Sequence, residues 1–298
     1  MNHFRPVIII FISLVITVFN FASVSAQQKG LLWQVTGRGI KQPTYLYGTI
    51  HLFDTTLYRV PQSVLAKLSE TKQVYFELDF GKVNPMEMMS SIMITDSTQR
   101  LDKVLDTASL HKLQEVIKTS PMMQMLGNNA YRVKPIFLSA FLMNNGKAVA
   151  IDMEMYKRAQ QLNDSVGGLE TVAKQLHAID AIPMATQVRM LKDMLQSYVS
   201  PDIAIRKITE IYVKQDIEHM MTAMNENLPI DADFNETLIV KRNLVMANRM
   251  VNLLGKQSIM IAVGSGHLGG KDGLIALLRK RGYTLKAVPF SFVKVVGN

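Results

Sequence analysis

The chain of 298 residues contains no cysteine, and this absence excludes disulfide bonds and a cysteine-linked lipid anchor. It must therefore be stabilised by the burial of a core. It also lacks a proline-, glycine- or serine-rich linker and any low-complexity tract, and charges of the two signs are interspersed along it. These absences favour a single domain over residues 27–298.

The first 26 residues have the pattern of a signal peptide and are set apart from the fold. Arg5 supplies the positive start, and small residues lead up to Ala26. The uncharged apolar run over residues 7–21 is shorter than the ~20 residues that a membrane-spanning helix needs. We expect cleavage after Ala26, no stable membrane anchor on the mature chain, and export to the periplasm or out of the cell.

A net charge of +9 raises the question of nucleic-acid binding. The densest basic cluster, Arg279-Lys280-Arg281, falls at the expected end of a helix, where the helix dipole favours cations. Aromatic residues are not interleaved with it, as they are in many nucleic-acid interfaces. We therefore expect no nucleic-acid partner. The 20 methionines are interpreted as flexible core residues, with an adaptable apolar groove as the alternative.

Two segments share one arrangement, in which an apolar strand ends at a glycine and a histidine follows. Residues 45–51 read YLYGTIH, and residues 258–267 read SIMIAVGSGH. Aromatic and β-branched residues favour strands, and glycine lets the backbone turn or approach a ligand closely. Ligands of open α/β sheets bind at the carboxyl ends of the strands. His51 and His267 are therefore candidate site residues.

A third strand is expected over residues 73–80, and it ends in acids. Glu77 and Asp79 are two residues apart, so on a strand they point to the same face. Imidazoles and a carboxylate at one sheet edge provide either a divalent metal site or a metal-free histidine–carboxylate base. Both arrangements activate water.

The remaining pattern predicts an α/β fold with a central mixed sheet and flanking helices. A strand over 31–35 forms a hairpin with the 45–48 strand, and another strand is expected at 165–169. Residues 85–145 have a helical pattern and are interpreted as an insertion that caps the site. Further helices are expected over 151–162 and between 184 and 254, with a closing strand at 283–288.

Residues 264–269 match the dinucleotide-binding pattern G-x-G-x-x-G, but the surrounding sequence argues against that function. The dinucleotide fold needs an acid at the end of the next strand, about 20 residues further on. No Asp or Glu follows Asp272. A phosphate-binding loop is also excluded, because Lys271 is followed by Asp272 and not by Ser or Thr.

These motifs together resemble those of the TraB/GumN family, which includes pheromone-shutdown proteins, GumN and the TIKI proteases. The resemblance spans essentially the whole mature chain. The matching elements, in chain order, are Tyr47-Gly48-Thr49-Ile50-His51, Glu77-Leu78-Asp79, Gly168-Leu169-Glu170-Thr171, Arg242-Asn243, Val263-Gly264-Ser265-Gly266-His267-Leu268, Gly273-Leu274 and Gly282-Tyr283.

The resemblance implies a fold shared distantly with erythromycin esterase and the haem-binding ChaN proteins. It also implies a metal-dependent peptidase site in which His51 and His267 bind manganese, cobalt or zinc. Glu77 is then a third ligand or the base for the attacking water, and Asp79 orients a ligand histidine. Arg242 is expected to hold a substrate carboxylate or polarise a carbonyl, with an ion pair to Asp79 or Glu170 as the alternative.

The expected substrate-binding residues are Gly48, Thr49, Gly264, Gly266, Arg242 and Asn243. Amides of the two glycines in the second histidine motif are expected to face an oxyanion. The leading hypothesis is an exported metal-dependent hydrolase that cleaves a peptide or protein. The alternatives are a metal-independent, esterase-like hydrolase that uses His51 and Glu77, and a protein that sequesters a peptide or haem.

Overall fold

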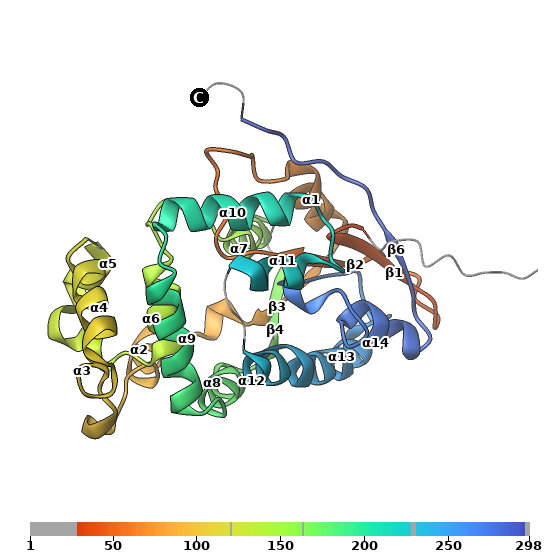
Figure 1. The fold of residues 1–298 in the computed structure, drawn as a ribbon. Helices are drawn as coiled ribbons and strands as arrows, with labels where there is room; N and C mark the ends of the chain where they lie inside the picture. Colours follow the sequence, from red (N-terminus) through yellow and green to blue (C-terminus); the bar gives the residue numbers. More distant parts are fainter. Residues whose placement is uncertain (1–28, 120, 163, 228–230, 296–298) are drawn as a thin grey trace, which may run out of the picture.

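A six-stranded sheet lies at the centre of the computed structural model, with strand order β4-β3-β5-β2-β1-β6 (Figure 1). The structure describes residues 29–119, 121–162, 164–227 and 231–295, so the expected signal peptide lies outside the described residues. The strands are β1 (Leu32–Thr36), β2 (Thr44–Thr49), β3 (Gln73–Leu78), β4 (Ser165–Glu170), β5 (Ile259–Gly264) and β6 (Thr284–Ala287).

The sheet is mixed, as the sequence predicts. The neighbours β2–β5, β5–β3 and β3–β4 are parallel, whereas β1 is antiparallel to both β2 and β6. The expected hairpin of β1 and β2 is confirmed. Residues of β2 and β5 are buried on both faces of the sheet, which is typical of parallel strands covered by helices. The α/β fold class is therefore confirmed.

Strand β5 lies between β2 and β3, and this order positions the candidate site. The two histidine segments follow β2 and β5, and Glu77 lies near the end of β3. Because these strands are parallel neighbours, their carboxyl ends meet at one edge of the sheet. Segments that are distant in sequence are thereby brought together.

Helices cover the sheet and extend beyond it (Figure 1). They are α1 (Gln62–Ala66), α2 (Pro85–Ser91), α3 (Leu101–Val104), α4 (Thr107–Thr119), α5 (Pro121–Leu126), α6 (Pro135–Leu142), α7 (Ile151–Gln161), α8 (Val172–Asp180), α9 (Met184–Gln196), α10 (Pro201–Val213), α11 (Met220–Asn227), α12 (Ala232–Phe234), α13 (Lys241–Leu253) and α14 (Leu274–Lys280). A π-helical segment, η5 (Asn235–Val240), leads directly into α13. In the described part of the chain, no helix combines the length and apolar character required to cross a membrane.

The expected insertion over 85–145 is helical, but it shares its core with a later helix. A second hydrophobic cluster, separate from the one around the sheet, contains Leu113, Val116 and Leu138 together with Leu191 and Leu195 of α9. Figure 1 shows α3, α4 and α5 grouped away from β1, β2 and β6. We refer to α2–α6 and α9 as the helical lobe.

No residue of 85–145 lines the pocket described below, so that pocket does not support the prediction that the insertion caps the site. The walls of the pocket come from the strand ends, from α7 and α8, and from the turn after β3. The lobe has an apolar cluster of its own, which residues 85–145 form together with α9. Its apolar periodicity therefore reflects a separate core, which the sequence pattern does not distinguish from a lid.

Gly48 allows the two histidine segments to approach each other. A Cβ atom at this position would lie 2.6 Å from Cδ1 of Leu268 and 3.1 Å from the Cα of Ser265. We expect Gly48→Ala to lower the free energy of unfolding by about 1–3 kcal/mol, because overpacking forces neighbours to shift. Urea denaturation measures this loss.

A double-mutant cycle tests that cause. Leu268→Ala removes the atom nearest to the new methyl group, so the double variant should lose less stability than the sum of the two single losses. Strictly additive losses would contradict the proposed contact.

Candidate active site

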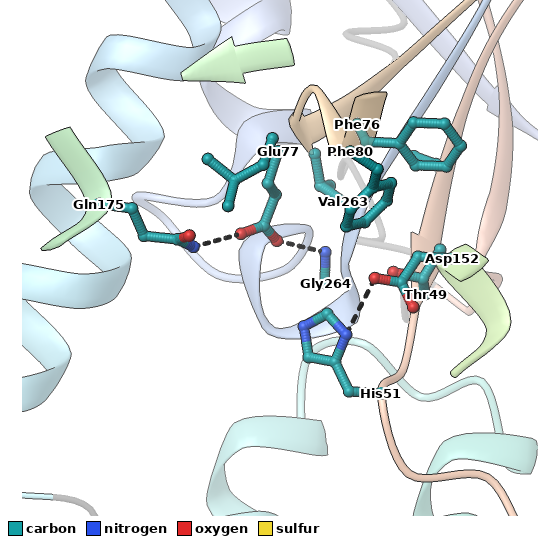
Figure 2. A pocket seen from close by; sticks show the side chains of 11 residues that line it. Thr49, His51, Phe76, Glu77, Phe80, Asp152, Gln175, Val263 and Gly264 are labelled. Atoms are coloured by element: carbon teal, nitrogen blue, oxygen red, sulfur yellow. Dashed lines mark hydrogen bonds and ion pairs between the residues drawn. The ribbon is translucent and has the colours of Figure 1, made fainter. Parts of the chain in front are cut away.

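A small pocket opens at the carboxyl ends of β2, β3 and β5 (Figure 2). Its volume is about 120 Å³. Its polar wall is formed by Thr49, His51, Glu77, Asp152 and Gln175, whereas Phe76, Phe80 and Val263 contribute apolar surface. The pocket lies where the sequence predicts a ligand site.

His51 lies at the rim of this pocket and is paired with an acid. Its Nδ1 atom is 3.0 Å from Oδ2 of Asp152, while 67% of the histidine side chain remains exposed. Because a carboxylate only accepts, Nδ1 carries the proton and donates it. The Nε2 atom is the nitrogen left for chemistry.

His267 is buried and has a comparable arrangement with a neutral partner. Its Nδ1 atom is 2.8 Å from Oδ1 of Asn243. The Nδ2 atom of Asn243 donates to the carbonyl oxygen of Asp272 at 2.8 Å, which fixes the orientation of the amide. Oδ1 of Asn243 must therefore accept from Nδ1 of His267. Nε2 is again the free nitrogen, and it lies 3.6 Å from Oε1 of Glu77.

Glu77 is held by donors on both oxygens. Oε1 accepts from the backbone amide of Gly264 at 2.7 Å, and Oε2 accepts from Nη2 of Arg242 at 2.6 Å. Nε2 of Gln175 is 3.5 Å from the same Oε2. Figure 2 shows the carboxylate between Gln175 and Gly264, on the side of the pocket opposite Asp152.

Arg242 lies in a buried ion cluster and is not open to a substrate. Its Nη2 atom contacts Glu77 and is 2.7 Å from Oε2 of Glu170, and its Nε atom donates to Glu170 at 2.8 Å. Its Nη1 atom donates to the carbonyl oxygen of Leu238. Of the two sequence-based expectations, the ion pair with Glu170 is observed. The expected contact of Arg242 with a substrate carboxylate or carbonyl is not supported, because these carboxylates occupy the guanidinium.

The expected oxyanion-binding glycines have other contacts. The amide of Gly264 is already bonded to Glu77, so it positions that carboxylate. Gly266 packs closely against Met221, whose sulfur would lie 2.8 Å from an added Cβ atom. Thr49 lines the pocket, whereas Gly48 does not line it and packs closely against Leu268 and Ser265.

The prediction that Asp79 orients a ligand histidine is wrong. Strand β3 ends at Leu78, so the alternation that would place Asp79 beside Glu77 stops there. Asp79 instead accepts from the amide of Gly81 at 3.2 Å and pairs with Lys82 at 3.0 Å. Asp152, which the sequence did not single out, is the acid bonded to His51.

The two histidines have different pKa values because their surroundings differ. Hydrogen bonding to Asp152 raises the pKa of His51 to about 9, despite opposing desolvation. Desolvation lowers the pKa of His267 to about 4. Burial raises the pKa of Glu77, but attraction to His267, Arg242 and His51 and the bond from Gly264 outweigh it and lower that pKa to about 2. At neutral pH, Glu77 is ionised, His267 neutral and His51 protonated.

Similar proteins indicate the family to which this chain belongs. The profile of the TraB/PrgY/gumN family matches residues 31–287. The chain belongs to this family. Metalloprotease TIKI2 of Danio rerio is 22% identical over 315 residues, covering 87% of this chain and 61% of the relative. Metalloprotease TIKI1 of Homo sapiens is 21% identical over 303 residues, covering 83% and 60%. The chain thus spans less than two thirds of the length of these relatives.

No solved structure matches the chain. The family profile and the TIKI relatives confirm the resemblance to the TraB/GumN family. The names of these relatives raise the question of whether this TraB/PrgY/gumN protein has side chains that suit a metal.

The donor chemistry suits a divalent transition metal, but the ligands are not preassembled. Both histidines have Nδ1 fixed by an oxygen, an arrangement typical of ligand histidines. Nε2 of His267 is free, whereas the raised pKa of His51 means that its Nε2 must release a proton to bind a metal. Within the described residues, no group of three or more His, Cys, Asp or Glu side chains is spaced to hold a metal ion. The oxygens of Glu77 are occupied by Gly264 and Arg242. The two histidines therefore fit a metal, whereas Glu77 as placed does not complete the site.

Replacing Asn243 by alanine tests how His267 is held. The variant leaves the Nδ1–H group of His267 buried without its acceptor, so we expect the free energy of unfolding to fall by about 1–3 kcal/mol. Any activity that depends on Nε2 of His267 should fall about 10–100-fold. Denaturation and hydrolysis assays measure the two effects.

Asn252→Ala is the matched control, since Asn252 is an exposed asparagine on the same helix. Equal stability of the two variants would contradict a structural role for the bond between Asn243 and His267.

Proposed function

We propose that this member of the TraB/PrgY/gumN family is an exported hydrolase of the peptidase type, acting on a peptide or protein in the periplasm or outside the cell. The observation that carries the proposal is the convergence of His51, Glu77 and His267 on one sheet edge, with Nδ1 of each histidine fixed by an oxygen. The name of the TIKI relatives, metalloprotease, supports the same class of reaction.

We propose His51 and His267 as ligands of a divalent metal, manganese, cobalt or zinc. Glu77 is proposed as the base for water or, once released from Arg242 or Gly264, as a third ligand. When bound, such a metal would supply Lewis-acid activation of water and of the substrate carbonyl. Neighbouring residues of the chain hold His267 and Glu77 in position for this chemistry. Asn243 keeps the lone pair of His267 on Nε2, and Arg242 and Gly264 keep Glu77 ionised and in place.

Thr49, Gly48, Gly264 and Gly266 are proposed to shape the substrate-binding face. The small pocket admits a small group, such as the scissile peptide unit or a short side chain. The aromatic wall of Phe76 and Phe80 favours apolar atoms beside the reacting carbonyl.

A metal-independent hydrolase is the second candidate, and one specific observation favours it. The environments push the pKa values of the histidines apart, to about 9 for His51 and about 4 for His267. Groups with such separated values are suited to act as acid and base. In this mechanism His51 protonates the leaving group, while His267 or Glu77 accepts a proton from water.

Metal content and turnover, measured together, test the proposal. Purified mature protein is analysed for metal after loading with manganese, cobalt or zinc, and its hydrolysis of a peptide library is assayed with and without a chelator. His51→Ala and His267→Ala are analysed alongside. We expect about one equivalent of metal, lost in both variants, and hydrolysis that the chelator abolishes and metal restores.

The other outcomes are equally informative. Chelator-insensitive hydrolysis that both histidine variants abolish would establish the metal-independent candidate. Tight peptide or haem binding without turnover would contradict a hydrolase and support a sequestering protein.

A further inference from the structure

The loop that carries His51 is joined to the start of α7 by backbone hydrogen bonds. Phe53 and Val149 exchange two such bonds, of 2.9 and 3.0 Å. The amide of Ile151 donates to the carbonyl oxygen of Ile50 at 2.9 Å. Because Ile50, Phe53 and Ile151 are all buried, this contact is also part of the core. The backbone on either side of His51 is therefore fixed against the backbone on either side of Asp152.

Asp152 lies where its carboxylate can accept a bond from His51. It lies in the first turn of α7, where the helix dipole stabilises negative charge. Its side chain is only 8% exposed, and Oδ2 is the atom bonded to His51. Oδ1 has no hydrogen-bond partner within the described residues. A buried carboxylate is costly unless paired, so its pairing with His51 matters to both residues.

His51 needs such a partner, because most of its side chain is exposed. An exposed imidazole samples several rotamers and, when neutral, both tautomers. The bond from Nδ1 to Asp152 selects one ring orientation and keeps the proton on Nδ1. Figure 2 shows the ring of His51 extended from Asp152 into the space below Glu77 and Gly264. The Nε2 atom of His51 is thus held facing the pocket.

We propose that Asp152 is a positioning residue, which fixes the ring of His51 so that Nε2 is the nitrogen presented to the reacting centre. This inference rests on the proposed hydrolase function and assigns a role to a residue outside the sequence motifs. It applies to both mechanisms, because a metal ligand and a proton donor each require a defined Nε2. In this role the acid acts through His51.

The test is the substitution Asp152→Asn in the full-length protein, with Glu154→Gln as the matched control. Both residues are acids in the first turn of α7, but Glu154 is bonded to Lys157 at 2.7 Å. Asparagine keeps the size of Asp152, but its amide can face His51 with either its oxygen or its NH₂ group. The substitution therefore no longer fixes Nδ1 as the protonated nitrogen. We expect kcat to fall about 10–100-fold with little change in KM. Glu154→Gln should retain the wild-type kcat.

A spectroscopic measurement separates positioning from a purely structural role. A proton held between imidazole and carboxylate gives a downfield N–H resonance in the NMR spectrum. We expect one such signal to disappear in both Asp152→Asn and His51→Gln and to persist in Glu154→Gln. Urea denaturation of the same samples confirms that the variants are folded under the assay conditions.

The outcomes distinguish this inference from the function on which it rests. Wild-type kcat in Asp152→Asn, together with loss of activity in His51→Gln, would overturn the role of Asp152 and leave the proposed hydrolase intact. Retention of the downfield signal in Asp152→Asn would overturn the inference as well. Wild-type activity in His51→Gln, or no hydrolysis by the wild-type protein, would overturn both.

Discussion

Replacing Arg242 by methionine is expected to lower the free energy of unfolding by about 3–5 kcal/mol, because the substitution leaves buried carboxylates without their cation. The guanidinium contacts Glu77 and Glu170, whose side chains are 14% and 3% exposed. Methionine approximately fills the volume of the arginine stem, so the loss reports mainly on charge. Urea denaturation at neutral pH measures it.

Arg249→Met is the control for this substitution. Arg249 is an exposed arginine on α13, so its replacement should change stability by no more than about 0.5 kcal/mol. Adding Glu77→Gln and Glu170→Gln to Arg242→Met removes the uncompensated charges and should recover part of the loss. A loss below 1 kcal/mol in Arg242→Met would show that the cluster does not depend on this cation.

The pH dependence of stability gives an independent check. In the wild-type protein, the pKa of Glu77 is lowered from 4.5 to about 2, so its contribution to stability is complete above pH 4.5 and is lost as the pH falls toward 2. Without Arg242, the pKa of Glu77 should rise toward its unfolded value, because one of the attractions that lower it is lost. The variant should therefore lose less stability than the wild-type protein as the pH falls from about 4.5 toward 2. Parallel profiles of the two proteins would contradict this.

The local features of the sheet could be predicted from the sequence. Each apolar run that ends in a glycine is a strand, and His51 and His267 follow the ends of β2 and β5. Glu77 also lies on the predicted strand. These are local properties, in which β-branched and aromatic residues and a terminal glycine define an element within one segment.

The partners of these residues could not be predicted, because they depend on tertiary contacts. Asp152 follows Ile151 at the start of an ordinary amphipathic helix, where acids are common for the sake of the dipole alone. Its contact with His51 depends on the tertiary fold, in which the backbone at Val149 pairs with that at Phe53. Asp79 failed as a candidate because β3 ends one residue before it.

The position of Arg242 in a buried ion cluster could not be predicted for a similar reason. Its residue type is suited both to substrate carboxylates and to buried ion clusters. The choice between them depends on β4 lying beside β3, which brings Glu170 and Glu77 to the same guanidinium. Helix α9 likewise joins the helical lobe through packing that no single amphipathic pattern specifies.

Replacing Glu77 by glutamine is expected to reduce hydrolysis about 10²–10⁴-fold, which is the range for loss of a group that handles the proton of the attacking water. The carboxylate lies 3.6 Å from Nε2 of His267 and accepts from Arg242 and Gly264. Glutamine has only one acceptor oxygen, so its amide group must face one of these two donors. The substitution therefore removes the charge and disturbs the contacts that position residue 77.

Stability and metal content separate the consequences of this substitution. Urea denaturation should show a folded protein, so that the lost activity is not due to unfolding, while Glu115→Gln, an exposed substitution in the helical lobe, should retain full activity. If Glu77 is the third ligand, Glu77→Gln should also bind metal more weakly. If it is the base for water, metal content should persist while turnover is lost. Full activity in Glu77→Gln would contradict both roles and place the chemistry on the two histidines alone.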